Sequence, residues 1–276
     1  MNQDLPNRGG DFPNQYQPSE QNWQAPPPPL DNTPVAEPPQ MSEVGTLGSI
    51  FFEPGKTFED LRRKPRFLMA GILSVVLLTM FIGAFYSKIG YERIVRERLE
   101  ASSWYQTQPP EVQKTMVQQQ ASPIAKYATL AVTPLFFFIS FFIGGLIYWG
   151  GTNAMGGSMS FLRGVAVWVY SGFPPMVVSM LANILVLFLK SPDDIDIAAS
   201  QQGLITANPS LFIDTKAAPV LGALLGTFDL FFIWGWILAA IGLRVIGKIS
   251  TGAAWTIVLM VALLNVAMRV VAALFQ

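Results

Sequence analysis

The chain has 276 residues, of which 51% are hydrophobic and 13% are charged, and its formal net charge is zero. It contains neither cysteine nor histidine, which excludes disulfides, thiolate metal sites and catalysis by a cysteine nucleophile or an imidazole base. Its apolar residues come in long unbroken blocks, without the period-2 or period-3.6 alternation of a soluble core. We therefore predict an all-α, polytopic membrane protein.

Residues 1–46 are predicted to form a disordered, proline-rich tail. They hold ten prolines, and proline fixes φ and removes a backbone donor, so such a segment does not form a packed core. The run APPPPL at residues 25–30 resembles the ligands of aromatic grooves, which leaves a protein partner as the alternative to a plain flexible tail. The tail carries six acidic residues and one arginine, which argues against nucleic acid as its partner.

The segment before the first apolar block is amphipathic and basic. Thr57 followed by Asp60 predicts the start of a short helix, with Phe58 and Leu61 on one face. Such a helix is expected to lie in the headgroup region of the bilayer. The basic residues are a topology signal, and they are also candidate contacts for anionic lipid at about 1 kcal/mol each. These candidates are Lys56, Arg62, Arg63, Lys64 and Arg66.

The first apolar block runs for 21 residues, from Phe67 to Ser87, without a charge, which is long enough to cross a bilayer core about 30 Å thick. Short helices outside the membrane are expected at residues 91–100 and 110–120. The third block is expected to be interrupted at Pro174 and Pro175. Residues 47–276 are thus predicted to form a bundle of five transmembrane helices with short interfacial helices. The expected spans are about 67–87, 127–149, 164–189, 219–246 and 253–275.

The basic cluster immediately before the first span predicts that the N-terminus lies in the cytosol and, with five spans, that the C-terminus lies on the far side. The expected location is the plasma (inner) membrane of a bacterium. The oligomeric state is left open.

Ionisable and amide side chains within the predicted spans are the main candidates for function. Asp229 and Arg269 lie about equally far from the turn that joins the last two spans, so we predict an intramembrane ion pair. Asn183 and Asn265 are candidates for hydrogen bonds between helices. The alternative is that these polar residues line a pathway for an ion or a small solute.

Three stretches together resemble the Yip1 domain family, in its prokaryotic branch. They are SIFFEPGKTFEDLRRKPRF, GGSMSFLRGVAVWVYSGFPPMVVSMLANIL and TFDLFFIWGWILAAIGLRVIGKISTGAAW. The resemblance covers about residues 48–275 and leaves out the tail. It implies a five-helix membrane domain with a cytosolic N-terminus. It supplies no catalytic residues, and the GTPase partners of eukaryotic relatives are not carried over.

Three classes of function follow from these observations. We expect a non-catalytic scaffold or lipid-organising protein whose partners are membrane lipids. The alternative is a small-solute or ion transporter or channel that uses the intramembrane polar residues. An intramembrane enzyme is the least favoured class, because the chain offers no catalytic constellation, and we expect no cofactor or metal site.

Overall fold

The computed structural model describes Met1 and residues 38–273, apart from 196, 198–202, 206 and 215–216. Most of the predicted tail therefore lies outside the described residues. Residues 38–46 are described, and they correct the predicted boundary of the membrane domain. Ser42 caps helix α1 (Glu43–Phe52) by accepting a hydrogen bond from the Gly45 amide. The ordered domain therefore begins before residue 47.

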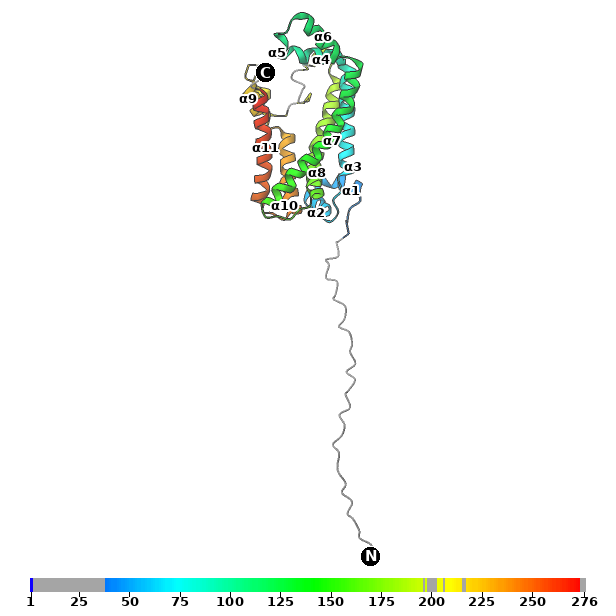
Figure 1. Cartoon of the computed structure of the whole chain (residues 1–276), viewed down its shortest axis with the longest axis vertical. Coiled ribbons are helices and arrows are strands. Elements are labelled where there is room, and N and C mark those ends of the chain that lie inside the picture. Colours follow the sequence, from blue (N-terminus) through cyan, green and yellow to red (C-terminus); the bar gives the residue numbers. More distant parts are fainter. Residues whose placement is uncertain (2–37, 196, 198–202, 206, 215–216, 274–276) are drawn as a thin grey trace. The chain divides into compact units, whose positions relative to one another are not determined.

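Every regular element in the described part of the chain is helical, and five helices there are long and apolar enough to cross a membrane (Figure 1). This confirms the predicted fold class. The five spans are α3 (Leu68–Ile89), α7 (Pro123–Ala154), α8 (Phe161–Leu189), α10 (Leu230–Gly247) and α11 (Thr251–Ala273). Many of their large apolar side chains are exposed, as expected for surfaces that face lipid.

Short helices lie at the two ends of this bundle (Figure 1). At one end α1 and α2 (Pro54–Arg63) precede the first span, and we call this the α1–α2 end. At the other end lie α4 (Tyr91–Glu100), α5 (Ser103–Gln106) and α6 (Pro110–Gln120). Within α4, Arg96 pairs with Glu92 at 2.6 Å and Arg93 pairs with Glu97 at 2.7 Å. Between α8 and α10 come η1 (Pro192–Asp194), η3 (Pro209–Phe212) and α9 (Pro219–Leu225).

The fourth predicted span is wrong in its start. A single helix was expected over about residues 219–246, but α9 ends at Leu225 and α10 begins at Leu230. Asp229 is the N-cap of α10, and its carboxylate accepts a hydrogen bond from the Phe231 amide at 2.9 Å. The 18 residues of α10 span about 27 Å, which is close to the thickness of the bilayer core.

The third span also differs from the prediction, because α8 runs as one helix through Pro174 and Pro175. Both prolines are buried between neighbouring helices. At membrane depth an unwound segment would leave more backbone groups without partners than the two prolines do, so the helix continues. Among the described residues, the fourth predicted span is therefore the only one that contains a break, which lies between α9 and α10.

The core is centred on α8 and α10. Val165, Val167 and Tyr170 of α8 and Leu243 of α10 are at most 1% exposed and belong to one apolar cluster, to which α1, α2, α7 and α11 also contribute. Helices α7 and α8 meet backbone to backbone: a Cβ added to Gly164 would lie 2.4 Å from the Gly145 carbonyl oxygen. Small residues of this kind permit the closest packing between membrane helices.

The chain has no cysteine of its own, so single cysteines report the orientation cleanly. We predict that Glu59→Cys and Ala154→Cys, at the α1–α2 end, resist a membrane-impermeant maleimide in intact cells. Gln118→Cys and Asp194→Cys, at the other end, should react, because the basic cluster retains the α1–α2 end in the cytosol. Equal labelling of Glu59→Cys and Gln118→Cys in sealed cells would contradict this orientation.

Candidate functional site at the α1–α2 end

Helix α2 is held against the transmembrane bundle by its apolar face. Phe58 and Leu61 are fully buried, and the Phe58 ring lies where α10 has Gly242 in place of a larger side chain. A Cβ on Gly242 would come within 2.9 Å of both the Phe58 ring and Val167. The face that was expected to meet the bilayer therefore faces protein. The large apolar side chains that are exposed at this end are instead Val44 and Phe52 of α1, at 65% and 87%.

A buried ion pair joins α2 to the start of the first span. The Asp60 side chain is 1% exposed and pairs with the Arg66 guanidinium, whose side chain is 10% exposed. The second carboxylate oxygen of Asp60 accepts hydrogen bonds from the amides of Gln40 and Met41, at 2.5 and 3.2 Å. A charged pair with so little exposure is stabilising only when most of its remaining hydrogen-bonding groups are also satisfied, and among the described residues the Arg66 Nε is buried without a hydrogen-bond partner.

Arg66 extends the same network into α1. It donates to the Met41 carbonyl at 2.8 Å and to the Thr46 hydroxyl at 3.1 Å, and Thr46 in turn donates to the Ser42 carbonyl. We call Asp60, Arg66, Met41 and Thr46 the Asp60–Arg66 lock. The lock ties three consecutive segments together: residues 40–46, α2 and the entry to α3.

The lock corrects two expectations. Thr57 does not cap a helix, because α2 begins at Pro54 and Thr57 donates its hydroxyl hydrogen to the Glu53 carbonyl within the helix. Arg66 is committed to the lock, so it is not placed as a lipid contact. The sequence did contain a signal for a buried charge in α2, because Asp60 falls three residues after Thr57, on the otherwise apolar face of the helix. The sequence did not show that residues 40–46 would fold back and hydrogen-bond to Asp60 and Arg66.

The other four predicted lipid contacts lie at the surface of the α1–α2 end. Lys64 is exposed, and Arg62 and Arg63 are half-buried, with the Nε of Arg62 itself buried. Lys56 donates to the Glu53 carboxylate at 2.7 Å, and this hydrogen bond raises the pKa of Lys56. We call Lys56, Arg62, Arg63 and Lys64 the basic face of α2.

The predicted intramembrane polar residues are placed mainly against the loop between α8 and α10. Asn183 accepts hydrogen bonds from the amides of Leu204 and Ile205, at 2.5 and 3.1 Å, so it joins a helix to a loop. Asp229 accepts from the Ala207 amide at 3.2 Å and from the Asn208 side chain at 3.1 Å. Both residues therefore hold described residues of this loop against the bundle, namely Leu204, Ile205, Ala207 and Asn208.

Asn265 and Arg269 lie one turn apart on α11. The Arg269 Nε donates a hydrogen bond to the Asn265 side-chain oxygen at 2.9 Å. This hydrogen bond of Asn265 lies within α11, whereas a bond between helices was expected. The guanidinium carbon of Arg269 is 5.1 Å from the centre of the Phe232 ring on α10. A direct ion pair between Asp229 and Arg269 remains a prediction.

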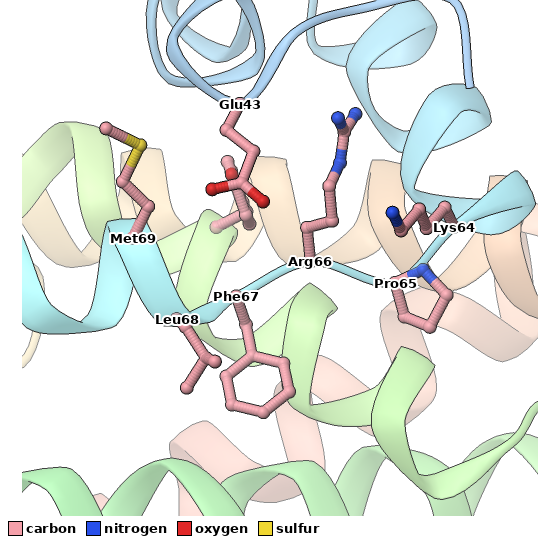
Figure 2. Close-up of a pocket in the computed structure, with 8 residues that line it drawn as sticks. Glu43, Lys64, Pro65, Arg66, Phe67, Leu68 and Met69 are labelled. Atoms are coloured by element: carbon pink, nitrogen blue, oxygen red, sulfur yellow. The ribbon is translucent and has the colours of Figure 1, made fainter.

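A cavity of about 210 Å³ opens beside the Asp60–Arg66 lock (Figure 2). Figure 2 shows Glu43 reaching from α1 toward the segment that leads into α3. We call this cavity the α1–α3 pocket. Its lining includes Glu43, Lys64, Arg66, Leu68, Met69 and Tyr170. In the described part of the chain, no group of acidic residues is arranged to hold a metal ion.

Comparison with known proteins agrees with the family resemblance of the sequence. The model of the Yip1 domain matches residues 48–273, which leaves out the proline-rich tail. The chain is also 25% identical over 216 residues to membrane protein YknW of Bacillus subtilis (strain 168). That alignment covers 78% of this chain and 84% of YknW. No solved structure matches the chain.

Proposed function

Because the chain belongs to the Yip1 domain family, we propose that it is a non-catalytic, membrane-organising protein that collects anionic lipid at its α1–α2 end. One observation carries the proposal: α2, which bears the basic face, is packed against the bundle through the buried Phe58 and contacts α1, whose Val44 and Phe52 are exposed. Cationic side chains at headgroup level attract anionic lipid, and the exposed apolar groups beside them favour the same depth.

The burial of the Asp60–Arg66 lock supports this proposal. The lock and the packing of Phe58 against Gly242 hold α2 in one orientation, so the helix that carries the basic face need not be ordered when lipid binds. The similarity to a bacterial membrane protein supports a location in a bacterial membrane. The basic cluster before the first span supports the further proposal that this is the plasma membrane and that the α1–α2 end lies in the cytosol. A protein partner for the proline-rich tail also remains a prediction.

Transport of a small solute or ion is the second candidate, and the break between α9 and α10 favours it. Discontinuous helices line the substrate sites of many transporters. The Asp229 carboxylate at this break, however, accepts hydrogen bonds from Phe231, Ala207 and Asn208. A carboxylate with these structural partners is less available to a solute, so we rank transport second.

The proposal predicts a loss of lipid from a charge-neutralised variant. We expect the full-length protein with Arg62→Gln, Arg63→Gln and Lys64→Gln to retain phosphatidylglycerol roughly a hundredfold less well than the wild type, since each of the three surface charges contributes about 1 kcal/mol. Native mass spectrometry of the detergent-solubilised protein, titrated with phosphatidylglycerol, measures this retention.

The matched control removes three positive charges from the opposite end, with Arg96→Gln, Arg98→Gln and Lys114→Gln. We expect this control to retain phosphatidylglycerol as the wild type does. Thermal stability is compared for both variants, so that a loss of folding is recognised. A folded α2 variant that retains as much phosphatidylglycerol as the wild type would overturn the proposal.

A further inference from the structure

The α1–α3 pocket carries both signs of charge at the depth of lipid headgroups. It lies where the chain enters the first span, directly before Leu68, the first residue of α3. Arg66 is paired with Asp60, so its charge is largely balanced within the lock. The charges left to a ligand are then the exposed ammonium of Lys64 and the exposed carboxylate of Glu43.

A ligand that matches this pocket has a phosphate and an ammonium group a short distance apart. We propose that the α1–α3 pocket binds the phosphoethanolamine headgroup of a phospholipid. Lys64, which lines the pocket, contacts the phosphate. Glu43 accepts hydrogen bonds from the ligand's primary ammonium. This inference adds a second lipid class to the proposed function and rests on its placement of the α1–α2 end in the headgroup region.

The size and rim of the pocket favour a lipid over a free solute. At about 210 Å³ it is smaller than the roughly 300–1,000 Å³ of pockets that enclose drug-sized ligands. It accommodates one headgroup and leaves the acyl chains outside. Leu68 and Met69, which are 57% and 39% exposed, continue from the pocket onto the face of α3, where acyl chains would pack.

Glu43 determines the expected selectivity. A primary ammonium donates three hydrogen bonds, whereas the trimethylammonium of phosphatidylcholine donates none. Phosphatidylglycerol brings a phosphate for Lys64 but no cation, so it would leave the Glu43 carboxylate without a partner and near a second negative charge. We therefore expect the pocket to prefer phosphatidylethanolamine to both.

Glu43→Gln tests the inference without altering the basic face of α2. In native mass spectrometry of the full chain, we expect this variant to bind phosphatidylethanolamine about tenfold more weakly, because a charge-assisted hydrogen bond is lost. We also expect its binding of phosphatidylglycerol to be unchanged or stronger, because a repulsive charge is gone. Glu111→Gln, which removes one exposed carboxylate at the opposite end, is the matched control and should bind both lipids as the wild type does.

Two results would overturn the inference: equal binding of phosphatidylethanolamine and phosphatidylcholine by the wild type, or unchanged binding of phosphatidylethanolamine by Glu43→Gln. Competition by glycerophosphoethanolamine as effective as that by the diacyl lipid would assign the pocket to a soluble phosphate ester instead. The proposed function fails on a different measurement, the retention of phosphatidylglycerol by the Arg62, Arg63 and Lys64 variant. The two failures are therefore distinguishable.

Discussion

Replacing Asp60 with asparagine is expected to lower the free energy of unfolding by about 3–5 kcal/mol, because it leaves the Arg66 guanidinium buried without its counter-charge. Asparagine keeps an oxygen that can accept hydrogen bonds from the amides of Gln40 and Met41. Its NH₂ group, however, would face the Arg66 guanidinium, and both groups are hydrogen-bond donors. Thermal or SDS-induced unfolding of the purified protein in mixed micelles measures the loss.

Two further variants make the Asp60 result specific. Glu53→Gln removes one partner of the exposed pair with Lys56 and is expected to leave stability unchanged within error. Adding Arg66→Met to Asp60→Asn should recover part of the lost stability, because methionine removes both the unpaired guanidinium charge and its contact with the asparagine NH₂ group. If Asp60→Asn is no more destabilising than Glu53→Gln, the lock does not hold the α1–α2 end to the bundle.

Replacing Gly164 with alanine is expected to destabilise the bundle by about 3 kcal/mol, at the upper end of the usual cost of overpacking. The new Cβ would lie 2.4 Å from the Gly145 carbonyl oxygen and 3.1 Å from the Trp149 amide nitrogen. Both are backbone atoms, so helices α7 and α8 must separate. The melting temperature of the detergent-solubilised protein, followed by size-exclusion chromatography after heating, measures the effect.

Gly172→Ala is the matched control, because it makes the same change two turns further along α8, where a new Cβ meets nothing within 4 Å. Alanine is the better helix former by roughly 0.5–1 kcal/mol, so this variant should be neutral or slightly stabilising. The two substitutions are therefore expected to differ in sign. A similar loss from both would mean that the close approach of α7 and α8 is not needed for stability.

The five spans could be predicted because the length and hydropathy of a segment are local properties of the sequence. The break before α10 was missed, since apolar residues continue on both sides of Asp229. A local signal did exist: Thr227 and Asp229 stand directly before an apolar run, as helix-capping residues do. The continuity of α8 through Pro174 and Pro175 could not be read from the residues themselves, because it depends on burial between neighbouring helices.

The candidate site could be predicted in its charges but not in its contacts. A run of basic residues before a span is visible in the sequence, and four of the five predicted residues lie at the surface. The commitment of Arg66 to Asp60 depends on residues 40–46 folding back over α2, about 20 residues away along the chain. Asn183 and Asp229 were recognised as polar residues of the spans, but their loop partners at residues 204–208 depend on tertiary structure.

Lipid sorting around the α1–α2 end within a bilayer tests the central claim most directly. A donor fluorophore on Phe52→Cys, the only cysteine in that variant, reports the lipids beside α1 in proteoliposomes that contain acceptor-labelled phosphatidylglycerol or phosphatidylcholine. We predict stronger energy transfer to phosphatidylglycerol, and we expect high salt or neutralisation of Arg62, Arg63 and Lys64 to abolish the difference. Equal transfer to the two lipids at low salt, with the protein folded, would contradict the account.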